Sequence, residues 1–323
     1  RINRCINMRR RNERKNTMSM IKTEYNVMSS DKKHTLAGHI YIPDVPGGEI
    51  KGLFHVVHGM CEHIGRYDEF MRKIADEGYI CFGYDNLGHG RTVSDDELGY
   101  IAHKEGYKRL AEDVGVYSAA VRKDFGGNLP YYLMGHSMGS FIVRYASENY
   151  VKPDKLIIMG TGGKNPAAGI GIALVDVMML FKGERYVSKF VDNMAFGSFG
   201  KKFPENESNS WLTKDAEIRE KYRSDKYCSF KFSLAAMKDL MTLNRATNSK
   251  AWFDGFDKKT PVLLVSGEDD PVGDYGAGVK KVYDELSSRG CIVKMKLYPN
   301  CRHEILNDTS REECTKEIID FIK

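Results

Sequence analysis

Short, uninterrupted apolar runs recur along the chain from about Lys33 and restrict the folds that it can adopt. Leu156–Met159 and Val262–Val265 contain no polar residue, as is typical of strands buried on both faces of a sheet. Segments with helical periodicity lie between these runs. We therefore expect an α/β fold with a mostly parallel central sheet and helices on both of its faces.

The individual elements follow from this alternation. Strands are predicted at His39–Ile42, Gly52–His58, Ile80–Tyr84, Tyr131–Met134, Lys155–Met159, Val262–Val265 and Val293–Tyr298. Helices are predicted at Tyr67–Asp76, Lys108–Lys123, Met138–Glu148, Gly276–Ser288 and Arg311–Ile322.

One long segment interrupts this alternation of strands and helices. About a hundred residues, 160–259, separate two predicted central strands, and a structureless loop of that length is improbable in a compact domain. The segment has helical patterns of its own at Ile170–Phe181, Lys214–Tyr222 and Phe232–Leu243. We expect an inserted, mainly helical cap at 160–259, and a core built from 21–159 and 260–323.

The positive charge of the chain is local. Residues 1–20 hold seven Lys and Arg against one acid, whereas the remainder carries 42 basic and 43 acidic residues. The basic segment lacks apolar periodicity, which indicates a disordered extension. A basic face for nucleic acid is not indicated, and we expect no nucleic-acid partner.

Cysteine usage and hydropathy indicate the compartment. The seven cysteines are odd in number and form no C-x-x-C pair, which favours a reducing cytoplasm over a disulfide framework. Arg1–Met20 contains no apolar signal region, and the apolar stretch Ile170–Phe181 is interrupted by Asp176 and too short for a membrane span.

The sharpest chemical signal is Gly135-His136-Ser137-Met138-Gly139. It directly follows an apolar strand and directly precedes a helical run, and in that context G-x-S-x-G is typical of a nucleophile elbow. The turn holds the serine in a strained conformation at the carboxyl edge of the sheet, and the glycines permit the close approach of strand and helix. A glycine-rich turn with an ordinary N-cap serine is the alternative.

A serine nucleophile needs a base and an acid, which follow it in the order Ser, Asp or Glu, His in this architecture. Of the nine histidines only His303 lies after Ser137, in a loop just past the last predicted strand. The turn after Val262–Val265 offers four acids, and we predict that the one three positions beyond Gly267, Asp270, orients the base. The other three acids of that turn are Glu268, Asp269 and Asp274.

Two backbone amides are needed to stabilise a tetrahedral oxyanion. One is expected from Met138, directly after the nucleophile, and the other from Met60, in the turn after the strand that contains His55. His55 and His58 are predicted not to chelate one metal ion, because positions three apart on a strand point to opposite faces.

Two glycine-rich segments are further candidate sites. Gly160–Lys164 lacks the first glycine and the final hydroxyl residue of a phosphate-binding loop. Asp85–Thr92 follows a predicted strand and is interpreted as a structural turn near the site.

Together these motifs resemble the α/β-hydrolase fold superfamily, and more narrowly its branch of monoacylglycerol lipases, lysophospholipases and serine aminopeptidase-like hydrolases. The resemblance covers about Thr35 to Lys323. It rests on His58–His63 with Arg66-Tyr67 as the oxyanion loop, Asp85–Thr92 as a D-x-x-G-H-G turn, Gly135–Gly139 as the elbow, and the Asp270-Pro271-Val272 and Arg302-His303-Glu304 loops. The chain departs from the family pattern at Cys61, where glycine is usual, and at Arg91-Thr92.

The predicted function is that of a cytoplasmic serine hydrolase that cleaves carboxylic esters through an acyl-enzyme, with no metal or organic cofactor. The family resemblance implies monoacylglycerol or lysophospholipid substrates. Small or aryl esters, thioesters and amides are the alternative substrates, and a non-catalytic ligand-binding protein is the alternative of another class. The cap is rich in Met and aromatic residues and is predicted to line the substrate pocket, with Met178 and Phe181 as acyl contacts, or to meet lipid. Ordinary packing of these apolar residues in the core is the alternative.

Overall fold

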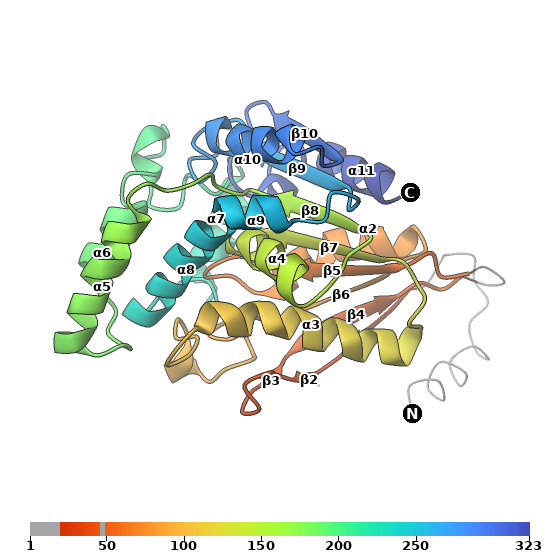
Figure 1. The fold of residues 1–323 in the computed structure, drawn as a ribbon, viewed down its shortest axis with the longest axis horizontal. Coiled ribbons are helices and arrows are strands. Elements are labelled where there is room, and N and C mark those ends of the chain that lie inside the picture. The colour runs from red at the N-terminus through yellow and green to blue at the C-terminus, as the bar shows by residue number, and fades with distance from the viewer. Residues whose placement is uncertain (1–19, 46–48) are drawn as a thin grey trace.

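A computed structural model describes residues 20–45 and 49–323, so the predicted basic extension lies outside the described residues except for Met20. Its centre is an eight-stranded sheet in the order β1-β4-β6-β5-β7-β8-β9-β10 (Figure 1). The strands are β1 (Ile21–Glu24), β4 (Gly38–Ile42), β5 (Leu53–Val57), β6 (Ile80–Tyr84), β7 (Tyr131–His136), β8 (Lys155–Met159), β9 (Val262–Gly267) and β10 (Val293–Tyr298). The six neighbouring strands β6, β5, β7, β8, β9 and β10 are parallel to one another. Strands β1 and β4 are antiparallel to their neighbours. The predicted fold class is confirmed.

Helices cover both faces of the sheet because its central strands are apolar on both sides. In β9, Val262 and Leu264 belong to one buried cluster and Leu263 and Val265 to the other. The first cluster includes residues of α3 (Gly106–Phe125), α4 (Met138–Asn149) and α10 (Ala277–Ser288), and the second those of α2 (Asp68–Asp76) and α11 (Arg311–Ile322).

The segment between β8 and β9 contributes five α-helices to the described chain. They are α5 (Ala168–Lys182), α6 (Lys189–Phe196), α7 (Ala216–Ser224), α8 (Leu234–Thr247) and α9 (Lys250–Gly255). Helix α5 packs on α8, which in turn packs on α3 and α4, while α6 stands away from the sheet (Figure 1). Part of the inserted segment therefore completes the helical layer beside the sheet, and the proposed boundary at residues 259 and 260 stays a prediction.

The remaining elements are short. Strands β2 (Val27–Met28) and β3 (Thr35–Leu36) pair as a small hairpin, and 3-10 turns occur at η1 (Ile64–Tyr67), η2 (Asp95–Glu97), η3 (Gly200–Lys202) and η4 (Ile305–Asn307). The sequence patterns did not predict β1 to β3, α6 or α9, which lack long apolar periodicity.

Two further findings concern the helices and the cysteines. Among the described residues, no helix combines the length and the apolarity needed to cross a bilayer. The six described cysteines are free thiols, and all six are buried.

Candidate active site

Ser137 occupies a sharp turn between β7 and α4. Its backbone has φ 55° and ψ −121°, a strained conformation for a residue with a side chain. A Cβ atom on Gly139 would lie 2.2 Å from the carbonyl oxygen of Val57, and one on Gly135 would lie 2.2 Å from the carbonyl oxygen of Gly139. Only glycine fits at both positions, so the local sequence dictates how the serine is presented.

Asp270 and His303 meet at the same edge of the sheet. The imidazole Nδ1 of His303 lies 2.9 Å from Oδ2 of Asp270, which is fully buried. The amide of Val272 donates to Oδ1 of Asp270, and the hydroxyl of Ser266 donates to Oδ2. These bonds orient the carboxylate toward the ring, so the structure brings together the acid and the base that the sequence singled out.

The neighbouring acids of the turn face elsewhere. Asp269 lies 3.6 Å from Lys214, and its side chain is 43% exposed. Glu268 and Asp274 are also exposed. Of the four acids in this turn, only Asp270 contacts the imidazole through a hydrogen bond that orients it.

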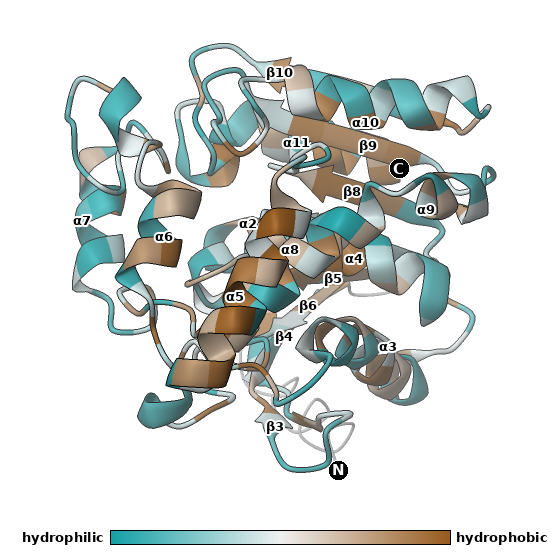
Figure 2. Ribbon diagram, turned by 60° about the vertical axis from the view of Figure 1, so that its left-hand side comes forward, coloured by the Kyte–Doolittle hydropathy of each residue, from teal (hydrophilic) through white to brown (hydrophobic). Residues whose placement is uncertain are grey.

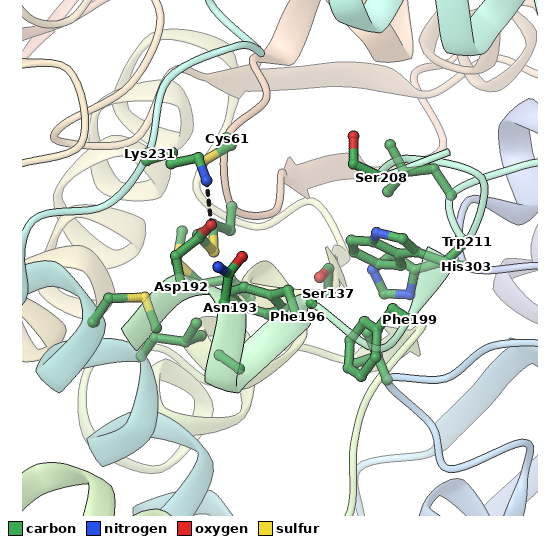
Figure 3. Close-up of a pocket in the computed structure, with 18 of the residues that line it drawn as sticks. Cys61, Ser137, Asp192, Asn193, Phe196, Phe199, Ser208, Trp211, Lys231 and His303 are labelled. Atoms are coloured by element: carbon green, nitrogen blue, oxygen red, sulfur yellow. Dashed lines mark hydrogen bonds and ion pairs between the residues drawn. The ribbon is translucent and has the colours of Figure 1, made fainter. Parts of the chain in front are cut away.

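Ser137 and His303 line one pocket, with Ser137 between Cys61 on one side and Trp211 and His303 on the other (Figure 3). Among the described residues, Nε2 of His303 has no hydrogen-bond partner. That nitrogen is therefore available to a hydroxyl brought within reach, and hydrogen bonds of this kind commonly tighten only when substrate is bound.

The loop after β5 lies directly against the serine. Met60 and Met138 both line the pocket, and the Met138 amide begins α4, where amides lack an intrahelical partner. The amide of Gly59 donates to Glu62 over 2.6 Å, and a Cβ atom on Gly59 would lie 2.9 Å from Cβ of Ser137. Met60, Ser137 and Met138 therefore line the same pocket, and the role of the two amides as oxyanion donors stays a prediction.

The two histidines before this loop serve separate partners. His55 lies 2.9 Å from the hydroxyl of Tyr131, and His58 accepts a hydrogen bond from the amide of Asn86. Burial lowers the pKa of His55 to about 3 and, as the largest cause, that of His58 to about 4. Both rings are therefore neutral and are held by separate partners.

The Asp85–Thr92 turn supports the same loop. The carboxylate of Asp85 accepts hydrogen bonds from the amides of Ile64 and Arg91, and a Cβ atom on Gly90 would lie 2.2 Å from it. This geometry agrees with the interpretation of the segment as a structural turn.

A buried ionic network beneath the serine was not predicted. Glu62 contacts His136, Tyr67 and Arg66, and Arg66 forms a bidentate pair with Glu304 at 2.7 and 2.6 Å. Burial alone would raise the pKa of Glu62, but His136 and Arg66 hold it well below its usual range. Burial would likewise lower the pKa of His136, but Glu62 raises it. The network joins the oxyanion loop, the elbow and the His303 loop.

The pocket has a volume of about 900 Å³, and most of its lining is apolar. Helix α5 contributes Ile170, Gly171 and Leu174 to it, but neither Met178 nor Phe181. Met178 packs against the core, and the side chain of Phe181 is 81% exposed. Neither of the two residues predicted as acyl contacts therefore lines the pocket, and the residues of α5 that do line it lie nearer the N-terminus of the helix.

Trp211, a residue that sequence reasoning missed, covers the proposed base. Its ring centroid lies 5.0 Å from that of His303, and its carbonyl oxygen accepts the His303 amide at 3.3 Å. The adjacent carbonyl of Leu212 accepts the amide of Glu304 at 2.8 Å. No local pattern could predict this pairing, because about ninety residues separate the two segments.

A parallel sheet covered on both faces, with Ser137 at a strand-to-helix turn and a buried Asp–His pair at the same edge, defines an α/β hydrolase. The family model described as serine aminopeptidase, S33, matches residues 48–310, and the chain belongs to this family.

Individual relatives agree with this assignment. The chain is 24% identical over 306 residues to a monoacylglycerol lipase of Mycolicibacterium smegmatis, covering 92% of this chain and 98% of that one. A monoglyceride lipase homolog of monkeypox virus is 26% identical, with coverage of 84% and 89%. A carboxyl esterase from Bacillus coagulans, solved in complex with glycerol, superposes with a TM-score of 0.86 at 28% identity, covering 94% and 98%. The chain is thus a monoacylglycerol lipase-like α/β hydrolase.

Proposed function

We propose that the protein hydrolyses carboxylic esters through an acyl-enzyme intermediate. Ser137 attacks the ester carbonyl while His303 takes its proton, and Asp270 orients and stabilises the resulting imidazolium. The amides of Met60 and Met138 stabilise the oxyanion, each contributing about 3 kcal/mol to lowering the barrier. His303 then protonates the leaving alcohol and activates the water that releases the acid. The observation that carries the proposal is the 2.9 Å Asp270–His303 contact, whose imidazole lines the same pocket as the strained Ser137.

The substrate we propose is a monoacylglycerol or a lysophospholipid. A largely apolar pocket of about 900 Å³ has room for a long acyl chain, and its lining includes Phe141, Leu174 and Met241. The relatives named above as monoacylglycerol lipases support this class.

We further propose that the inserted segment acts as a cap that touches a lipid surface. Apolar side chains are strongly exposed along α5 and α6, and Figure 2 shows α5 as largely hydrophobic. The most exposed are Ile170 at 77%, Leu180 at 82%, Phe181 at 81% and Phe190 at 61%. Because the same helices line the pocket, contact with lipid would place the substrate beside its entrance.

A fluorophosphonate probe tests the mechanism directly. Wild-type protein should be labelled at Ser137 and should hydrolyse p-nitrophenyl and monoacylglycerol esters, whereas Ser137→Ala should do neither. The matched control is Ser140→Ala, a change at the next serine along the chain, which lies on α4 and whose hydroxyl donates to the Ser137 carbonyl. Labelling of Ser137→Ala at another serine would contradict the assignment, and a preference for acetate esters over monoacylglycerols would favour a small-ester esterase.

A further inference from the structure

A second cluster of chemically active side chains lies beside the catalytic pocket, where the oxyanion loop meets the inserted segment. His63 follows Met60 by three residues, and Asp225 and Cys228 follow helix α7. One ligand atom from each of the three lies within 4.8 Å of the other two. An imidazole nitrogen, a carboxylate oxygen and a sulfur are the ligand set that Zn²⁺ prefers.

The surrounding contacts orient two of these ligands, His63 and Asp225, toward each other. Oδ1 of Asp225 accepts the amide of Tyr227 at 2.8 Å, which leaves Oδ2 pointing at Nε2 of His63, 3.0 Å away. The ring of Tyr227 packs edge-on against that of His63, with centroids 6.0 Å apart. Both side chains are therefore held in place before any ion arrives.

The separations suit a tetrahedral ion. Bond lengths of about 2.0 to 2.3 Å place the ligand atoms of a tetrahedral zinc site about 3.3 to 3.7 Å apart. Closing the cluster to that size needs a movement of at most about 1.5 Å at Cys228, and the 3.0 Å His63–Asp225 contact needs only to open slightly. The side chains of His63 and Asp225 are 21% and 33% exposed, so solvent can deliver the ion and fill a fourth position.

We propose that His63, Asp225 and Cys228 form an inhibitory binding site for Zn²⁺ or a similarly soft divalent cation. The ion replaces the thiol proton of Cys228, which is released to solvent, and binds the neutral imidazole and the carboxylate. Binding of the ion does not depend on the proposed function, but the inhibition does.

Inhibition follows from the position of the ligands. His63 belongs to the loop that carries Met60, whose amide must lie within about 3 Å of the oxyanion. Cys228 lines the catalytic pocket itself. An ion that ties the two together pulls on the loop and restricts movement of the inserted segment relative to the sheet.

Metal titration of the full chain tests the site with two readouts. Zn²⁺ should raise the melting temperature and, with Co²⁺ in its place, should produce the absorption of a cobalt–thiolate bond. Zn²⁺ should also reduce hydrolysis of p-nitrophenyl butyrate, and EDTA should restore it. Cys228→Ser and Asp225→Asn should each weaken metal binding and inhibition by at least about tenfold.

The matched controls change a histidine and a cysteine that lie outside the proposed metal site. His103→Ala removes an exposed His that lies 2.6 Å from Glu184, and Cys291→Ser removes another buried thiol, so neither should alter the response to metal. A wild-type protein without metal-induced stabilisation or cobalt–thiolate absorption would overturn the site. Inhibition that persists unchanged in Cys228→Ser would also overturn it, since the ion would then act elsewhere. Binding without inhibition would overturn the inhibitory role alone.

Discussion

At the scale of single residues, the site depends on groups that are each held by several partners. Asp270 receives hydrogen bonds from Ser266 and Val272 while it contacts His303, and it is fully buried. A carboxylate this well supported keeps the imidazole in one tautomer, which a serine nucleophile requires.

Replacement of this carboxylate should therefore be far more damaging than replacement of its neighbours. We expect Asp270→Asn to lower kcat/KM by a factor on the order of 10³ to 10⁴, because an amide stabilises the wrong tautomer of His303. Asp269→Asn and Asp274→Asn should change it by less than about threefold, since Asp274 is exposed and Asp269 is partly exposed. Steady-state kinetics on p-nitrophenyl butyrate provide the comparison, and a larger loss in Asp274→Asn would show that the acid is misassigned.

At the scale of elements, helix α5 presents different residues to the pocket and to solvent. Leu174 lines the pocket, whereas Phe181 on the last turn is 81% exposed. We expect Leu174→Gln to lower kcat/KM for long-chain esters at least about tenfold more than for acetate esters, since it removes apolar contact with the acyl chain. Phe181→Gln is the control and should show no such chain-length dependence on soluble esters. Equal losses across chain lengths in Leu174→Gln would indicate general destabilisation instead.

The contact between α8 and α3 should make stability depend on pH. Asp239 on α8 is buried and accepts hydrogen bonds from the backbone amides of Gly106 and Tyr107 at the start of α3. Burial raises its pKa to about 7, against the opposing effects of those amides and of Lys238. Between about pH 4 and 7, the folded state therefore keeps a proton on Asp239 that the unfolded state has lost. The contribution of Asp239 to the free energy of unfolding consequently falls as pH rises through that window.

Asp239→Asn should remove that contribution. Relative to wild type, the variant should gain stability as pH rises from about 4 to 7, by a few kcal/mol at most, because each pKa unit corresponds to about 1.4 kcal/mol. Urea unfolding of both proteins at several pH values measures the difference. A difference that does not change with pH would mean that Asp239 titrates normally.

At the scale of the whole molecule, exposed apolar side chains gather on the inserted segment that also forms part of the pocket. We expect Leu180→Gln combined with Phe190→Gln to reduce binding to phospholipid vesicles and turnover of vesicle-borne monoacylglycerol several-fold, because both side chains are exposed and apolar. Hydrolysis of soluble p-nitrophenyl butyrate should be unchanged. Vesicle sedimentation measures the binding, and an unaltered vesicle affinity would exclude this surface as the contact.

The amino-acid sequence by itself determined the strands β4 to β10 of the sheet, most of the helices around it and the residues of the proposed triad. Apolar runs and helical periodicity are local properties, and the elbow is built from five consecutive residues, Gly135–Gly139, whose glycines meet a local steric demand. The order of serine, acid and base along the chain then left His303 as the only candidate for the base.

Only the tertiary structure decided which residues meet across long separations. The Glu62–Arg66–Glu304 network, the Trp211–His303 pairing and the His63–Asp225 contact each join segments about 90 to 240 residues apart. The outward orientation of Phe181 likewise depends on how α5 packs on α8. A periodic pattern identifies an apolar face, but the partner of that face is set by the packing of the entire chain.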